Sequence, residues 1–172
     1  ITWLNPAFTT APAANVTDYA KADMVINFAD PASIAWAGNF TEPAANDGSV
    51  TGTRTGTLTD DTFISSIVDS AIFTPVTHYT ITGVPAGLTA TLTKTSSTVA
   101  TLTLTGNATV HTNAVDVSNI TITFVDGVFT NTTSAINVAN YTNATGAIDF
   151  RDVTMAYSTG IFTEAAILDG SI

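Results

Sequence analysis

Residues 88–106 read LTATLTKTSSTVATLTLTG, and this stretch decides the fold class. Apolar residues alternate with threonine on both sides of KTSST (94–98), so that Leu88, Ala90 and Leu92 face one side of a strand and the threonines face the other. KTSST is rich in small polar residues that favour turns, and we therefore predict that the two halves form a hairpin. One face of that hairpin is expected to be buried and the other solvated.

The same alternation recurs along the chain, for example in TGTRTGTLT (51–59), which has threonine at every odd position. Turn signals such as ANDG (45–48), GVPAG (83–87) and VDG (125–127) separate the alternating runs. The segment TFISSIVDSAIF (62–73) has mixed spacing that fits a short helix or an irregular loop. The further core residues predicted by the alternation are Tyr79, Ile81, Leu102, Leu104, Ile120, Ile122, Phe124, Ile148 and Phe150.

The composition also favours strands over helices. About a fifth of the 172 residues are threonine, which with Val, Ile and Phe belongs to the strand-favouring set, whereas Leu, Lys, Glu, Arg and Gln are scarce. Seven or so short strands, with turns every 8 to 12 residues, predict an all-β fold, specifically an antiparallel β-sandwich of immunoglobulin-like type. A barrel or a jelly roll is the alternative, which alternation by itself does not exclude.

The chain repeats its own sequence at an offset of about 122 residues. FTEPAANDGSV (40–50) returns as FTEAAILDGSI (162–172), and ITWLNPAFT (1–9) aligns with ITFVDGVFT (122–130). Outside a short gapped stretch, 19 of residues 1–50 have identical partners. A period above 100 residues is the size of an independent domain. The repeat therefore predicts a tandem array of domains.

The repeat gives the period, and the strand patterns suggest its phase. INFADPA (26–32) and IDFRDV (148–153) resemble final strands followed by an acidic exit, whereas NFTEPAANDGSV resembles an opening strand. We expect residues 1–31 to be the closing strands of one repeat and residues 32–152 to be a complete repeat. Residues 153–172 are then expected to be the opening strand of the next.

Four stretches together resemble the tandem repeat of very large bacterial surface proteins and adhesins. They are FTEPAANDGS (40–49), GTLTDDTF (56–63), residues 79–111 and VSNITITFVDGVF (117–129). The most specific part runs from GVPAGLTATLTK (83–94) to ATLTLTGNA (100–108). The resemblance implies an extracellular, immunoglobulin-like, tandemly repeated stalk or fibre at the cell surface. It does not imply a ligand, because in such proteins adhesion is commonly carried by a distinct terminal module.

Charge and composition exclude several functional classes. The chain has 4 Lys and Arg against 14 Asp and Glu, a net charge of -10. Nucleic acids and anionic membrane surfaces require clustered basic side chains, so neither is an expected partner. Cysteine is absent, which leaves no disulfide framework and no thiolate metal site. The sequence contains no apolar run of 18 residues and no signal-peptide pattern, so no membrane insertion is expected within it.

Catalysis has little support in the sequence. His78 and His111 are the only two histidines, and neither lies in a nucleophile-elbow, zincin or cysteine-protease pattern. His78 is expected on the threonine-bearing face of its strand, in solvent. We therefore expect no enzymatic activity.

Acidic residues recur at matching places in the repeat and suggest a metal. Carboxylates and turn carbonyls between β-domains could supply the six to eight oxygens that Ca²⁺ prefers, and would stiffen the junction. Asp60 and Asp61 are a second, weaker pair. The alternative explanation is that acidic residues lie in turns because turns are solvated. The candidate ligands are Asp30, Glu42 and Asp47 at one junction and Asp149, Asp152, Glu164 and Asp169 at the other.

Trp3 and Trp36 raise the alternative of a sugar-stacking platform, although Trp3 aligns with the inward-facing Phe124 and is better explained as core. The chain also contains N-x-Ser/Thr triplets, which matter only where the source glycosylates its surface proteins. They begin at Asn15, Asn39, Asn107, Asn119, Asn131, Asn140 and Asn143.

The sequence thus supports three functional hypotheses. The leading one is a structural segment of a long extracellular fibre, stalk or adhesin, whose partners are neighbouring repeats and whose ligand, a glycan or another surface molecule, is bound elsewhere in the full protein. In this hypothesis backbone ladders between the terminal strands resist force. The second is a self-polymerising filament or surface-layer subunit, in which identical subunits join by β-strand addition. The third is a carbohydrate-binding module.

Overall fold

The computed structural model describes residues 30–153 together with Thr2, Ala20, Met155 and Gly160. Contacts divide the chain into two units, Ile1–Asp30 and Pro31–Ile172. In the first unit, Thr2 and Ala20 form an isolated antiparallel bridge. All the described strands lie in the second unit, to which the following description applies.

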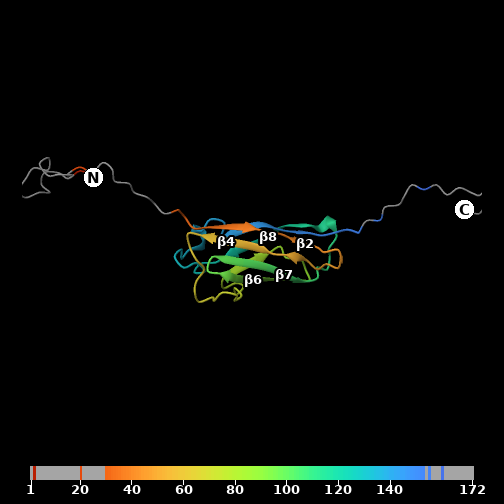
Figure 1. Ribbon diagram of the computed structural model, residues 1–172, viewed down its shortest axis with the longest axis horizontal. Coiled ribbons are helices and arrows are strands. Elements are labelled where there is room, and N and C mark those ends of the chain that lie inside the picture. The colour runs from red at the N-terminus through yellow and green to blue at the C-terminus, as the bar shows by residue number, and fades with distance from the viewer. Residues whose placement is uncertain (1, 3–19, 21–29, 154, 156–159, 161–172) are drawn as a thin grey trace, which may run out of the picture. The chain divides into compact units, whose positions relative to one another are not determined.

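Nine described strands form two sheets (Figure 1). The four-stranded sheet has the order β1-β4-β7-β6 and is antiparallel, and the five-stranded sheet has the order β3-β2-β9-β8-β5. The strands are β1 (Ser33–Ala37), β2 (Phe40–Thr41), β3 (Thr51–Gly52), β4 (Arg54–Thr59), β5 (Tyr79–Thr82), β6 (Leu88–Ser96), β7 (Val99–Gly106), β8 (Val117–Phe124) and β9 (Thr142–Asp149). The all-β, two-sheet prediction is confirmed. The antiparallel prediction holds for the first sheet only, because β2 and β9 are parallel.

The hairpin predicted from residues 88–106 is present. β6 and β7 pair in antiparallel register, with Leu92 opposite Leu102, and the register shifts once between Lys94 and Ser96. Leu92 and Leu102 are fully buried, whereas Thr89 on the opposite face of β6 is exposed. Alternation therefore placed both strands correctly, because a buried face and a solvated face impose a period of two.

The core lies between the two sheets and includes most of the predicted residues; Ile81 and Ala90 are only half-buried. An aromatic cluster closes one end of it, with ring centroids 5.2 to 5.8 Å apart. Its members are Phe63, Phe73, Phe124 and Phe129.

Residues 62–73 form an irregular loop that supplies two of those rings, so the helical alternative is wrong. The buried ammonium of Lys94 holds this loop by donating to the carbonyls of Ile64 (3.2 Å) and Ile67 (2.7 Å). The backbone of Ser70 also donates to the carbonyl of Lys94. These bonds to β6 replace the bonds that a helix would make within itself.

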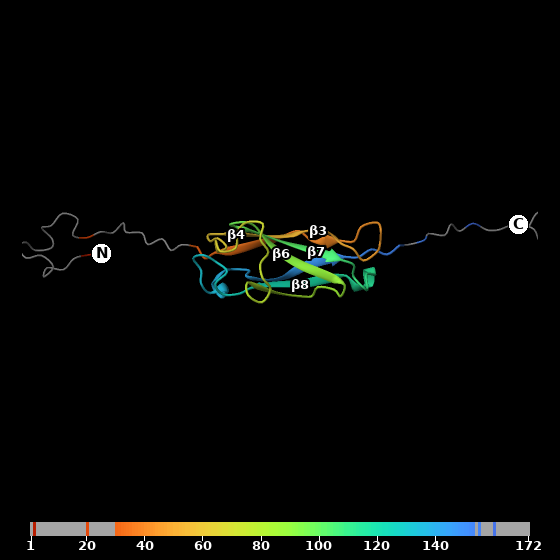
Figure 2. The same cartoon turned by 90° about the horizontal axis from the view of Figure 1, so that it is seen from below.

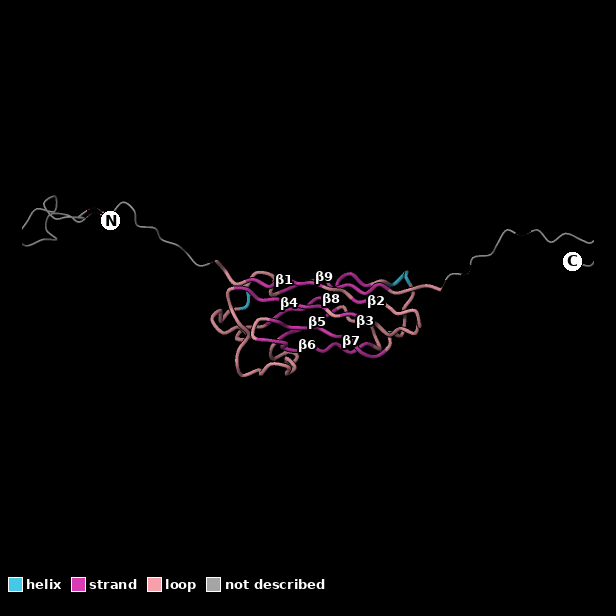
Figure 3. Tube along the Cα trace, viewed as in Figure 1, coloured by secondary structure: helices cyan, strands magenta, loops and turns pink. Residues whose placement is uncertain are grey.

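The described chain enters and leaves the sandwich at opposite ends (Figures 1 and 2). We call the side where β1 begins the N-terminal end and the side where β9 ends the C-terminal end; Figure 3 shows the strands running between them. The pairing registers place loops 60–78 and 125–141 at the N-terminal end and loops 83–87 and 107–116 at the C-terminal end. Short 3₁₀ turns, Asn113–Val115 and Ala135–Asn137, are the only helical turns in the described residues, and no described helix could cross a membrane.

Candidate functional site

The second strand of the sandwich, β2, lies beside the last strand, β9, and runs in the same direction. Phe40 pairs with Ile148 and Thr41 with Asp149 in a parallel ladder between β2 and β9. We call residues 32–42 and 139–149 the terminal-strand pair. It is the only parallel strand pairing among the named strands that the structure describes.

Further backbone bonds close both ends of this pair. At the N-terminal end, Ile34 N donates to the carbonyl of Ala139 (2.9 Å), and Ala139 N donates to the carbonyl of Ala32 (2.8 Å). At the C-terminal end, Glu42 N donates to the carbonyl of Asp149 (2.9 Å). The backbones of the pair are therefore bonded at both ends, while β1 between them pairs with β4 in the other sheet.

The carboxylate of Glu42 joins the end of β2 to the segment after β9. It is buried, with only 2% of the residue exposed. Its Oε2 accepts from Arg151 N (3.0 Å) and its Oε1 accepts from Gly48 N (2.6 Å). Burial acts to raise the pKa of Glu42, but the N–H groups of Arg151 and Gly48 and the nearby His111 lower it, and the pKa lies below its ordinary value.

Two further side chains complete the surroundings of Glu42. His111 Nδ1 lies 3.0 Å from Glu42 Oε1 without forming a hydrogen bond, and the contact is an ion pair when the ring is protonated. With its amide oriented to suit its neighbours, Asn46 donates to Glu42 Oε2 (3.1 Å) and to the carbonyl of Arg151 (2.7 Å). Gly48 has a φ of +81°, and a β-carbon there would overlap the backbone of Ala108. The backbone that brings the N–H of residue 48 to Glu42 therefore requires glycine at this position.

Two aspartates hold the chain where it leaves the sandwich. Asp116 Oδ1 accepts from Phe150 N (2.9 Å), and Asp152 Oδ1 accepts from Asn113 N (3.0 Å). Together with Glu42, they bond the chain on both sides of Arg151. These contacts order residues that lie beyond the last strand.

Arg54 links the two sheets from within the core. Only 3% of the residue is exposed, although it projects from the inner face of β4. Its Nη1 donates to the carbonyl of Gly38 (2.9 Å) and to Asn39 Oδ1 (3.2 Å), and its Nη2 donates to Asn143 Oδ1 and Thr145 Oγ1 (both 2.6 Å). In the described part of the chain its charge has no carboxylate partner, and burial lowers its pKa. The guanidinium thus ties β4 to the β1–β2 corner and to β9.

The structure groups the predicted calcium ligands differently from the sequence. Glu42, expected at the junction with Asp30, lies beside the backbone of Asp149 at the C-terminal end. Both oxygens of Glu42 already accept N–H groups, and Asp47 Oδ1 accepts from the backbone N–H and the hydroxyl of Ser49, which lower the pKa of Asp47.

The remaining candidates are exposed or outside the described residues. Asp30, Asp149 and Asp152 are exposed, and Glu164 and Asp169 lie outside the described residues. Within the described residues, no three His, Asp or Glu side chains form a group that could hold a metal ion. Calcium binding at the junctions stays a prediction.

The weaker acidic pair, Asp60 and Asp61, separates into two roles. Asp60 is exposed, whereas Asp61 is buried and organises two loops at the N-terminal end. Its oxygens accept from the backbone N–H groups of Thr62 (2.7 Å), Asn131 (3.0 Å) and Thr132 (2.8 Å). Burial acts to raise the pKa of Asp61, but these N–H groups lower it below its ordinary value.

The aromatic and histidine candidates are engaged in packing. The indole of Trp36 stacks on Phe124 (6.1 Å between centroids) and donates to the carbonyl of Asn140 (3.2 Å), while Trp3 lies outside the described residues. The expectation of a solvated His78 is wrong, because the ring is half-buried against Phe73 and its Nδ1 accepts from Thr74 N (2.8 Å).

No family model, no curated protein and no solved structure matches this chain. The function is therefore inferred from the chain's own geometry and from its repeated sequence.

Sequence reasoning missed the bonding roles of Arg54 and Asp116. For Arg54 a signal was present, because alternation in TGTRTGTLT places it on the same face as Leu58. For Asp116 there was none, because its partner, the N–H of Phe150, is 34 residues away in the sequence. The parallel pairing of β2 with β9 also had no sequence signal.

Proposed function

We propose that this chain is a segment of a long extracellular fibre, stalk or adhesin, built from tandem immunoglobulin-like repeats that resist tension. The observation that carries the proposal is the terminal-strand pair, whose two strands are parallel and adjacent while the chain enters and leaves at opposite ends. The internal repeat of about 122 residues supplies the tandem arrangement.

Parallel terminal strands determine how tension acts on the sandwich. Pulling on both ends of the repeat makes residues 32–42 and 139–149 slide past each other, because each strand is drawn toward a different end. The bonds of Ala139, Glu42 and the β2–β9 ladder then lie across the direction of sliding and bear the force together. Bonds loaded together must break together, whereas bonds loaded from one end break one at a time. This geometry favours mechanical resistance.

The extracellular location and the membership of a bacterial surface array rest on the resemblance of the repeat sequence. An acidic chain with no cysteine and an outer surface of threonine is compatible with that setting. A carbohydrate-binding module has less support, because the indole of Trp36 packs against Phe124 and is not free to stack on a sugar ring.

Single-molecule pulling of the full chain, held at its two termini, tests the proposal. We expect the sandwich to open in one event at high force. Glu42→Gln should lower that force. Arg151 N and Gly48 N donate to different oxygens of the Glu42 carboxylate, whereas a glutamine side chain has only one oxygen, which carries no full charge. Forced unfolding is governed by the unfolding rate, so the force reports on bonds that break at the barrier.

Asp61→Asn is the matched control. It alters a buried carboxylate that also accepts several backbone N–H groups, but at loops outside the terminal-strand pair. It should lower the thermal midpoint yet leave the unfolding force nearly unchanged. If the repeat opens at negligible force, or if both variants lower the force equally, the mechanical proposal is wrong.

A further inference from the structure

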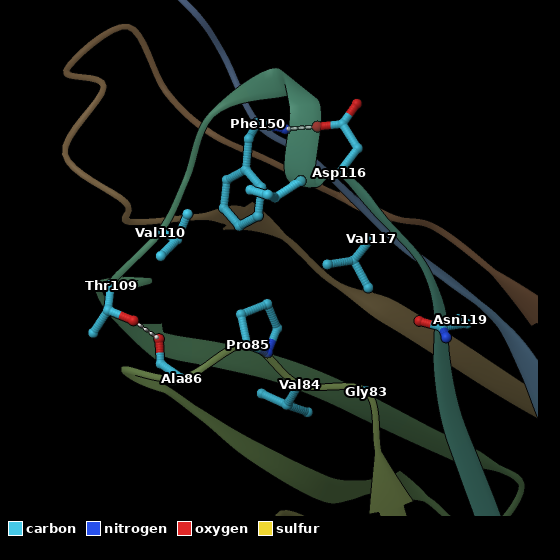
Figure 4. A pocket seen from close by; sticks show the side chains of 11 residues that line it. Gly83, Val84, Pro85, Ala86, Thr109, Val110, Asp116, Val117, Asn119 and Phe150 are labelled. Atoms are coloured by element: carbon cyan, nitrogen blue, oxygen red, sulfur yellow. Dashed lines mark hydrogen bonds between the residues drawn. The ribbon is translucent and has the colours of Figure 1, made fainter.

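A groove of about 420 Å³ opens at the C-terminal end of the sandwich (Figure 4). Its walls come from loops 83–87 and 107–116, from β8 and from the residue that follows β9. Most of the lining is apolar: Val84, Pro85, Val110, Val115, Val117 and Phe150. Val110 and Val115 are 58% and 41% exposed, so the groove presents apolar surface to solvent.

Exposed apolar side chains avoid the sheet faces of this repeat. In the described residues, none of the large exposed hydrophobic side chains belongs to a strand, and the outer faces of β4, β6 and β7 carry threonine. One such side chain, Ile136, is 71% exposed at the N-terminal end, in a 3₁₀ turn close to the bonds between Ala139 and Ala32. Apolar surface is thus available at both ends of the sandwich, which favours contact end to end over contact between faces.

The sequence repeat brings a second copy of the N-terminal end close to the groove. At the offset of 122 residues, Met155 is the equivalent of Ser33, where β1 begins. Only residues 151–154 separate Phe150, which lines the groove, from that position. The five residue steps from Phe150 to Met155 span at most about 18 Å when fully extended. The following repeat therefore begins within a short distance of the groove.

The small size of the groove also favours an occupant that is joined to the repeat by a short linker. A stable complex between separate proteins buries upwards of about 1,000 Å². A short linker instead gives an effective concentration in the millimolar range, at which a much smaller contact is occupied. Contacts between domains of one chain are accordingly smaller and weaker than obligate interfaces.

We propose that the apolar groove at the C-terminal end of each repeat receives the N-terminal end of the following repeat, including the turn that carries Ile136. This inference rests on the proposed tandem array and adds a specific contact that orients successive repeats. The bonds from Asp116 to Phe150 N and from Asp152 to Asn113 N hold the intervening chain at the rim of the groove. The contact limits bending between repeats.

Cysteine accessibility tests the contact directly, because the chain has no cysteine of its own. Two chains are compared: the full chain, and the full chain continued after Ile172 by a second copy of residues 51–152, which completes the repeat that residues 153–172 begin. Val110→Cys in the first repeat is labelled with a maleimide in each. Thr89→Cys, on the exposed outer face of β6, is the matched control.

We expect Val110→Cys to react about tenfold more slowly in the extended chain than in the 172-residue chain, because labelling then requires the contact to open. Thr89→Cys should react at the same rate in both chains. Ile136→Asp in the second repeat should restore the fast reaction of Val110→Cys, whereas Thr89→Asp in the second repeat should not.

Equal rates for Val110→Cys in the two chains, with both repeats folded by thermal unfolding, would overturn the contact. Protection that grows with protein concentration in the 172-residue chain would assign the groove to a separate copy and would also overturn it. Neither result depends on force, so a repeat that resists pulling but shows no protection leaves the mechanical proposal standing. Protection of Val110→Cys in a repeat that opens at negligible force would support the contact between repeats and contradict the mechanical proposal.

Discussion

At the scale of the residue, Arg54 is the most unusual feature of the core. A buried guanidinium without a carboxylate is costly unless neutral acceptors bind it, and here four oxygens from two segments, the β1–β2 corner and β9, do so. Its aliphatic part passes Gly146, whose β-carbon position lies 3.4 Å from Arg54 Cδ. Arg54 therefore combines packing with a polar link between the sheets.

Arg54→Met should lower the free energy of unfolding by about 3 kcal/mol, because the carbonyl of Gly38 and the oxygens of Asn143 and Thr145 lose their donor inside the protein. Urea unfolding monitored by circular dichroism measures this loss. Arg151→Met, whose side chain is exposed, is the control and should change the free energy by less than about 0.5 kcal/mol. A loss for Arg54→Met as small as that of the control would contradict the role of Arg54.

At the scale of the element, the corner between β1 and β2 makes the terminal-strand pair possible. β1 pairs with β4 in one sheet and β2 pairs with β9 in the other, so the chain must change sheets within Gly38 and Asn39. Gly38 has a φ of +85°, and a β-carbon there would overlap the carbonyl of Thr53. The corner thus depends on the absence of a side chain at this position.

Gly38→Ala should lower the free energy of unfolding by about 2 to 4 kcal/mol, from left-handed strain and from the overlap with Thr53. Gly127→Ala is the matched control, because Gly127 has a similar φ of +79° but open space around the position of the β-carbon. It should cost only the strain, about 1 to 2 kcal/mol. Thermal unfolding of the two variants gives the comparison, and equal losses would show that the corner has room for a methyl group.

At the scale of the whole molecule, buried carboxylates at both ends make stability depend on pH. Glu42 and Asp61 have pKa values below their ordinary values of 4.5 and 3.8 in the folded protein, because N–H groups stabilise their charged forms. A carboxyl whose pKa is lowered by folding stabilises the protein above its unfolded-state pKa. That stabilisation is lost as the pH falls from the unfolded-state value through the folded-state value.

We expect the urea midpoint to hold steady from neutral pH down to about pH 5 and to fall at lower pH. In the double variant Glu42→Gln and Asp61→Asn, which cannot lose a proton at these positions, the midpoint should be lower at neutral pH and should fall less steeply with acid. A midpoint of the native chain that is constant down to about pH 3 would show that Glu42 and Asp61 do not stabilise the folded protein through lowered pKa values.

The sequence by itself determined the fold class and most of the core, because alternation with a period of two reflects the difference between a buried and a solvated face of each strand. It placed Leu92, Leu102 and Ile122 inside, and it located the β6–β7 hairpin through its turn residues. It also determined the repeat, which is a property of the sequence itself.

Only the tertiary structure decided which strands that are distant in the sequence are neighbours. The parallel pairing of β2 with β9, the bond from Arg151 N to Glu42 and the bond from Phe150 N to Asp116 each join residues far apart in the chain. No local pattern records such pairs, because the propensity of a residue depends on its neighbours in sequence, whereas these bonds depend on how two sheets pack. Glu42 and Asp149, which the sequence assigned to separate junctions, therefore lie at the same end of one repeat.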